Sequence, residues 1–189
     1  ASRDLLHVPT GYRSPEVASF VAQLDDLTRY LKKDLRGITR RELEWQPAPG
    51  MNTIGMLLTH IAIVEIWWID CGLRRIPGPK VDFVGQIGIR DTDDGMPAKR
   101  GGGHPAAITG KSWGDYQRLL ARARTRVRAV ARAVTPRSLG VAARRIRRDG
   151  KVHVFNNRWV LFHMVEHFAG HYGQILMLRH AYRARGRRS

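Results

Sequence analysis

The segment from Ile54 to about Cys71 constrains the fold most, because its side chains are apolar on almost every side. A helix of this kind has no solvent-facing side and must be surrounded by other elements. Its apolar stretch from Ile54 to Ile69 is interrupted by His60 and Glu65, which makes it too short and too polar at its centre for a membrane span. We therefore expect the most buried helix of a soluble domain.

Three other segments show the three- and four-residue spacing of apolar side chains that is typical of amphipathic helices. They cover residues 14–37, residues 112–135, and a final segment that runs from 156 or 157 to about 182. Each begins with a serine or asparagine, residues that cap helix N-termini well. Together with residues 54–71, these segments predict an all-α fold, an antiparallel four-helix bundle.

Two connections interrupt the helical pattern. Residues 76–111 contain eight glycines and four prolines, and we expect a long loop over one end of the bundle, with a short strand at residues 81–89. Residues 144–155 form two alternating arms around Asp149-Gly150. This pattern predicts a β-hairpin with a type I′ turn before the last helix.

The length of 189 residues suits a single domain. We expect it to span residues 1–189, with an N-terminal extension at 1–13 and a basic tail at 182–189. The lone cysteine, Cys71, excludes an internal disulfide framework and fits a buried, inert thiol. The first ten residues carry charge and lack the apolar core of a signal peptide, so we expect a cytoplasmic protein.

The chain carries 33 Lys and Arg residues against 16 Asp and Glu residues, a formal charge of +17. Such an excess would suit an anionic substrate or a nucleic acid. Only six of the cations are lysines, however, so a bias of the genome toward arginine codons explains the excess equally well. No recognition-helix motif occurs, which argues against nucleic acid. The arginines expected on the outer face of the third helix are Arg118, Arg122, Arg126, Arg124, Arg128 and Arg132.

The last helix carries His163, His167 and His171 at four-residue spacing. Two imidazoles at positions i and i+4 lie on one helix face and can bind one metal ion. The outer two of the three lie about 12 Å apart along the axis, too far to share a tetrahedral ion easily. A third ligand should therefore come from a facing helix.

His60 is the candidate for that third ligand. It lies in the middle of the apolar helix, where an unpaired imidazole costs free energy, so it needs a hydrogen-bond partner or a metal ion. We expect His60, His167 and His171 to hold one divalent metal ion. Three protein ligands would leave a fourth position for water or substrate, as in catalytic metal sites.

The motifs GMNTIGMLLTHIAIVEIWW and FHMVEHFAGHYGQI, together with the turn TRRELEWQP, resemble the DinB/YfiT-like superfamily. More distantly, the chain is similar to the mycothiol-dependent maleylpyruvate isomerase group. The resemblance implies a four-helix bundle with a divalent metal ion on a helix-two histidine and on the histidine pair that precedes Gly-Gln. By position, these ligands fall on His60, His167 and His171. The family also implies a homodimer.

The resemblance implies a metal-dependent enzyme, either a thiol S-transferase that uses a low-molecular-weight thiol or a hydrolase of a small molecule. The arginine excess would suit an anionic substrate. We expect zinc or nickel as the metal, with iron, manganese and copper as alternatives, since imidazole suits zinc, nickel, iron and copper alike. Two other classes stay open. One is a nucleic-acid-associated protein, and the other is a catalytically silent bundle that the metal ion stabilises.

Five further residues are candidates for the site, each with a structural alternative. His163 could act as a general base or be a bundle histidine, and Glu65 could bond a ligand imidazole or pair with an arginine. Tyr172 and Gln174 could position substrate, pack in the core or make a hydrogen bond on the helix face, and Trp67 could line a pocket or fill the core. We expect His163 and Glu65 in catalytic roles and the other three in substrate binding.

Overall fold

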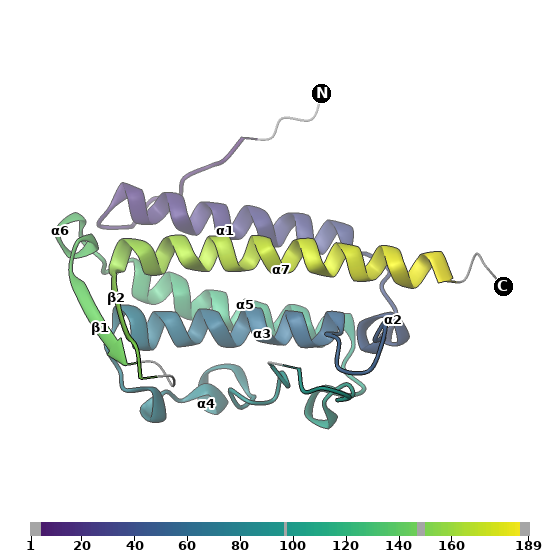
Figure 1. Ribbon diagram of the computed structural model, residues 1–189. Helices are drawn as coiled ribbons and strands as arrows, with labels where there is room; N and C mark the ends of the chain where they lie inside the picture. Colours follow the sequence, from purple (N-terminus) through teal and green to yellow (C-terminus); the bar gives the residue numbers. More distant parts are fainter. Residues whose placement is uncertain (1–4, 97, 147–149, 186–189) are drawn as a thin grey trace.

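The computed structural model describes residues 5–96, 98–146 and 150–185. These residues are mostly helical, with one antiparallel hairpin before the last helix. Four long helices lie side by side (Figure 1). They are α1 (Pro15–Asp34), α3 (Ile54–Trp67), α5 (Trp113–Ala131) and α7 (Asn157–Arg185).

Side chains that were expected from the sequence begin these helices. Ser14 accepts a hydrogen bond from the third residue of α1, and Ser112 does the same for α5. Thr53 caps α3, since its side chain accepts from the backbone N–H of Met56. Asn156 caps α7, since its side chain accepts from the backbone N–H of Trp159 at 2.8 Å. These caps satisfy N–H groups that have no partner inside the helix.

Helix α3 is the central helix, as predicted. Nearly all its residues are buried, and the exceptions include His60. By length and composition alone, Ile54–Leu73 could cross a membrane, but 78 % of the most apolar 18-residue stretch in this segment is buried inside the protein. Burial of this kind is expected for the core helix of a helical domain. A π-helical turn, η1 (Trp68–Leu73), continues α3.

Helices α3 and α5 run in the same direction, which the prediction of antiparallel neighbours missed. Gly55, at the start of α3, lies so close to Tyr116 at the start of α5 that a Cβ would be 2.5 Å from the Tyr116 hydroxyl. Near the other end of both helices, Glu65 pairs with Arg124. The reason is the long connection, which returns along the molecule before α5 begins (Figure 1).

Helices α1 and α7 are also parallel, because Glu16 pairs with Arg158 near their starts and Tyr172 donates a hydrogen bond to Asp34 farther along. Helices α1 and α5 run in opposite directions, and so do α3 and α7. In the second pair, His60 of α3 contacts His167 in the middle of α7. Trp68, just after the end of α3, contacts Trp159 near the start of α7, so the two helices are antiparallel. Among the neighbouring long helices, the antiparallel expectation therefore holds for these two pairs and fails for α3–α5 and α1–α7.

The long connection lies along the flank of α3 rather than over one end of the helices (Figure 1). The strand predicted at residues 81–89 is wrong, because the chain forms α4 (Phe83–Ile87) there. Asp82 caps this short helix, and Gly88, with φ 78°, ends it. The other short helices in the described part of the chain are α2 (Arg40–Glu44), η2 (Gly78–Lys80), η3 (Ala106–Ile108) and α6 (Pro136–Leu139).

The predicted hairpin is present as β1 (Ala142–Ile146) and β2 (Val152–Asn156). Arg144 lies opposite Val154 in its antiparallel register. The type I′ turn was predicted at Asp149-Gly150, and Asp149 lies outside the described residues. Parts of the predicted N-terminal extension (1–4) and basic tail (186–189) also lie outside them.

Candidate metal centre

Three imidazoles from two helices converge at the contact between α3 and α7. The ring centroid of His60 lies 5.0 Å from that of His167 and 5.1 Å from that of His171. The centroids of His167 and His171 are 4.3 Å apart. One nitrogen from each ring lies within 4.8 Å of the other two. The donor set fits a divalent metal ion, because neutral imidazole nitrogens are ligands for zinc, nickel, iron and copper.

His60 has a carboxylate partner that the sequence analysis did not identify. Its Nδ1 lies 2.7 Å from an Oδ of Asp94, whose side chain is buried. Asp94 is held in turn by the backbone N–H of Met96, at 2.9 Å. When Nδ1–H donates to the carboxylate, the lone pair of the neutral ring is on Nε2. Such outer carboxylates orient metal-binding histidines and raise their basicity.

His171 is fixed in a similar way by Gln174. The side-chain oxygen of Gln174 lies 2.9 Å from Nδ1 of His171. The Nε2 atom of His171 is 3.0 Å from Nε2 of His167. The amide of Gln174 thus orients a histidine of the cluster, and its role in substrate binding stays a prediction.

Burial keeps the paired histidines of α7 neutral. Desolvation, together with the nearby His171, His60 and His163, lowers the pKa of His167 to about 3. Desolvation also lowers the pKa of His171, against the opposing effect of Gln174. A neutral imidazole offers the lone pair that a metal ion needs, whereas an imidazolium does not.

His163 lies beside the cluster but in an aromatic environment. Its ring stacks on Trp159, with centroids 4.6 Å apart and planes 7° apart, and meets the edge of Trp68. Its centroid is 5.7 Å from that of His167. Desolvation lowers the pKa of His163, although Glu166 partly opposes this shift. His163 is therefore a neutral group next to the cluster, and its catalytic role stays a prediction.

Glu65 does not face the histidines. Its carboxylate binds the guanidinium of Arg124, with nitrogen–oxygen distances of 2.6 and 3.2 Å, and both side chains are buried. The arginine pairing, one of the two roles considered for Glu65, is the one present. A catalytic role for Glu65 stays a prediction. Arg124 was expected on the outer face of its helix, but this ion pair draws it into the core.

Tyr172 and Trp67 also point to other partners. The Tyr172 hydroxyl donates a hydrogen bond to Asp34 and thus joins α7 to α1. Trp67 stacks near Phe83 of the long connection, with centroids 6.4 Å apart, and Arg145 of the hairpin lies over its ring. These contacts agree with structural roles for both side chains, and their roles in substrate binding stay predictions.

Cys71 lies in a setting that disfavours its ionisation. Burial raises the pKa of its thiol to about 11, and the carboxylate of Asp70 adds to the shift, whereas Arg145 opposes it. A thiol with this pKa is almost fully protonated at neutral pH. The inert thiol expected from the sequence agrees with this environment.

A cleft of about 460 Å³ lies between α3 and the long connection, and none of the three histidines lines it. Met56, one helical turn before His60 on α3, forms one wall. The other wall comes from the long connection on both sides of Asp94, and it includes Lys99 and several glycines. The long connection therefore supplies both the carboxylate that holds His60 and most of the lining of this cleft.

Comparison with known proteins places these features in a family. No curated protein matches the chain. The family model described as mycothiol-S-transferase matches residues 19–184, a range that contains the three converging histidines and the whole long connection. Because this match covers most of the sequence, the chain belongs to the mycothiol S-transferase family.

Proposed function

We propose that this protein is a metal-dependent S-transferase that joins a low-molecular-weight thiol to a small electrophilic substrate. The metal ion is held by His60, His167 and His171, and the scaffold is a four-helix bundle of α1, α3, α5 and α7. The observation that carries the proposal is the convergence of the three imidazoles in a chain of the mycothiol S-transferase family.

The chemistry that a divalent cation supplies in such a site is stabilisation of the thiolate, which makes the thiol a nucleophile at neutral pH. Asp94 and Gln174 serve this site by holding the rings of His60 and His171 in the orientation described above. Because both rings are fixed through Nδ1, each can present Nε2 to the ion.

The residues around the cluster have separate tasks. His163 accepts the proton of the thiol through Nε2, since its Nδ1 faces Glu166 at 3.7 Å. Desolvation keeps its imidazole neutral and ready to accept a proton. The cleft beside Met56 holds the electrophilic substrate, and Lys99 provides a positive charge there for an anionic substrate. The cytoplasmic location, the homodimer and the single domain stay predictions.

Two measurements test this proposal. Protein purified without a nickel column should contain about one divalent metal ion per chain, as a three-histidine site allows. After substitution with cobalt, addition of N-acetylcysteine should shift the visible absorption bands, because sulfur enters the coordination sphere. A substoichiometric metal content that His60→Ala leaves unchanged would contradict the metal site. If cobalt binds but its absorption bands do not shift when the thiol is added, the metal only stabilises the helices.

A further inference from the structure

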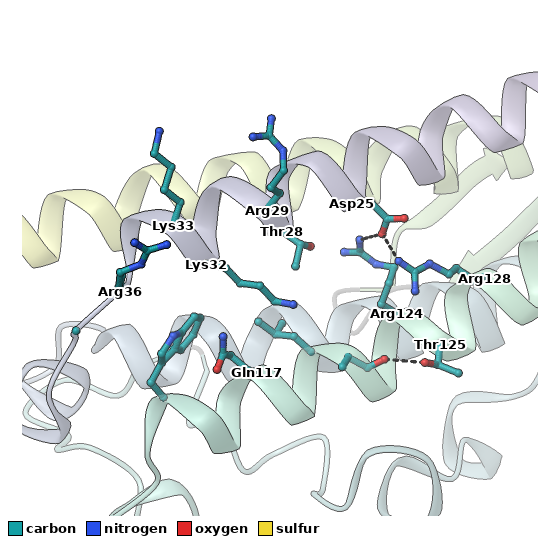
Figure 2. A pocket seen from close by; sticks show the side chains of 14 residues that line it. Asp25, Thr28, Arg29, Lys32, Lys33, Arg36, Gln117, Arg124, Thr125 and Arg128 are labelled. Atoms are coloured by element: carbon teal, nitrogen blue, oxygen red, sulfur yellow. Dashed lines mark hydrogen bonds and ion pairs between the residues drawn. The ribbon is translucent and has the colours of Figure 1, made fainter. Parts of the chain in front are cut away.

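A second hollow of about 820 Å³ lies between α1 and α5, the two long helices that contribute no histidine to the metal centre. We call it the α1–α5 groove. Its volume falls in the range of small-molecule sites. Figure 2 shows the groove with α1 along one side and α5 along the other.

The lining of the α1–α5 groove has a large excess of positive charge. Asp25 is the only acidic residue among the described residues that line it. The basic residues are Arg29, Lys32, Lys33, Arg36, Arg124 and Arg128. A hollow lined by one sign of charge concentrates ions of the opposite sign.

The charges at one end of the groove are compensated. Asp25 lies 2.9 Å from a guanidinium nitrogen of Arg124 and 2.9 Å from one of Arg128. Arg124 is neutralised a second time by the buried Glu65. Arg29 pairs with Asp26 at 2.7 Å and points away from the groove (Figure 2). This end therefore offers little attraction to a further anion.

The other end carries uncompensated cations. Among the described residues, no acidic side chain pairs with Lys32, Lys33 or Arg36. Figure 2 shows Lys32 reaching from α1 across the groove toward α5, while Lys33 points away. Lysine usually extends its ammonium group into water, so this orientation places a charge where a ligand in the groove would meet it.

The wall on α5 supplies hydrogen-bond donors and an apolar floor. Gln117 points toward α1 in Figure 2, and its side-chain amide has no hydrogen-bond partner in the described part of the chain. The same holds for the indole N–H of Trp113. Leu120, which is 5 % exposed, lies between this end and the compensated end. Apolar area beside a few polar groups is typical of small-molecule sites.

We propose that the α1–α5 groove is a second binding site, for a small organic anion. Lys32, with Gln117 and Arg36, binds a carboxylate, sulfonate or phosphate group. Leu120 and Trp113 cover the carbon body of the ligand. The site is separate from the metal centre, and its ligand differs from the thiol and from the electrophile of the transfer reaction.

The proposal can be tested with 8-anilinonaphthalene-1-sulfonate, a fluorescent probe that joins an anionic group to aromatic rings. The full-length protein should bind it saturably and should bind the uncharged N-phenyl-1-naphthylamine much more weakly. Lys32→Glu should weaken binding by about tenfold or more, through loss of a charge-assisted hydrogen bond and reversal of the charge. Lys80→Glu makes the same charge change on an exposed residue outside the groove and should have little effect.

A second pair of variants tests the shape of the site. Ala121 lines the groove and is exposed, so Ala121→Trp should fill the groove and remove probe binding without disturbing the core. Ala129→Trp, on an exposed position of the same helix outside the groove, should leave binding intact. Binding should also survive in His60→Ala, which separates this site from the metal centre.

Three results would overturn the proposal. The first is the absence of saturable binding of the sulfonate probe to the wild-type protein. The second is an equal loss of affinity in Lys32→Glu and Lys80→Glu, or in both tryptophan variants, which would indicate binding to the general positive surface. The third is displacement of the probe by random-sequence duplex DNA whose own affinity depends on Lys32, which would make the groove a nucleic-acid surface.

Discussion

The contact between α3 and α7 and the groove between α1 and α5 are both rich in nitrogen side chains, yet they suit opposite ions. At the α3–α7 contact, burial lowers the pKa values of His167 and His171, so these rings are neutral electron-pair donors for a cation. In the groove, the ammonium group of Lys32 and the guanidinium group of Arg36 are cations that attract anions.

The difference shows how desolvation acts on different nitrogen bases. A buried histidine can lose its proton, and the neutral ring then costs less free energy to bury than the charged ring would. An arginine cannot, so Arg124 enters the core only because Glu65 and Asp25 outweigh the cost of its desolvation and raise its pKa. The Glu65–Arg124 pair thus links α3, which carries His60, to α5, which forms one wall of the groove.

The largest expected effect is the loss of bound metal from the α3–α7 contact, which should leave the α1–α5 groove unchanged. His60→Ala should reduce bound metal from about one ion per chain to near zero, because two histidines at four-residue spacing bind a divalent ion much more weakly than three. Metal analysis after dialysis measures the change. His180→Ala, on an exposed position of α7, serves as the control and should keep its metal. Full metal content in folded His60→Ala would show that His60 is not a ligand.

The next largest effect is a loss of stability when the Glu65–Arg124 ion pair, which joins α3 to α5, is broken. Glu65→Gln should lower the free energy of unfolding by about 3 kcal/mol, because it removes one partner of a buried ion pair and leaves Arg124 with Asp25 alone. Urea denaturation measures the loss. Glu16→Gln breaks an ion pair with Arg158 at the surface, where solvent screens the charges, and should cost far less. Equal costs would show that burial of the Glu65 pair contributes no extra stability.

A smaller effect is expected at the carboxylate that holds His60. Asp94→Ala should weaken metal affinity by about 10- to 100-fold, as is usual when an outer carboxylate is lost. Competition with a fluorescent chelator measures this affinity. Asp94→Asn should give an intermediate value, because the amide oxygen still accepts the Nδ1 proton. Asp91→Ala, at an exposed position of the same loop, should match the wild type. Unchanged affinity in Asp94→Ala would remove its positioning role.

The smallest expected effect is that of salt, which should weaken anion binding in the groove but not metal binding at the α3–α7 contact. Raising sodium chloride from about 0.05 to 0.5 M should weaken binding of the sulfonate probe several-fold, because the exposed charges of the groove are screened. Metal affinity should stay constant or rise slightly, since screening weakens repulsion between the ion and a chain of charge +17. Parallel titrations at both salt concentrations measure this. The same weakening in both titrations would argue that the two regions do not differ in charge.

The local features of the fold could be predicted from sequence because local physics produces them. The serine at the start of α1 and the threonine at the start of α3 cap helices wherever those helices pack. The four-residue spacing of His167 and His171 places both rings on one helix face in any helical fold. The search for a third ligand on an apolar helix then led to His60, and the structure brings the three rings together.

The sequence by itself therefore determined which residues form the long helices and which histidines could share an ion. Tertiary structure alone decided the parallel course of α3 and α5, because an irregular connection of this length can return along the flank or cross an end. It also decided that Asp94 meets His60 and that Glu65 meets Arg124, residues 34 and 59 positions apart. Helix periodicity and capping carry no information over such separations, since these contacts depend on which faces pack together.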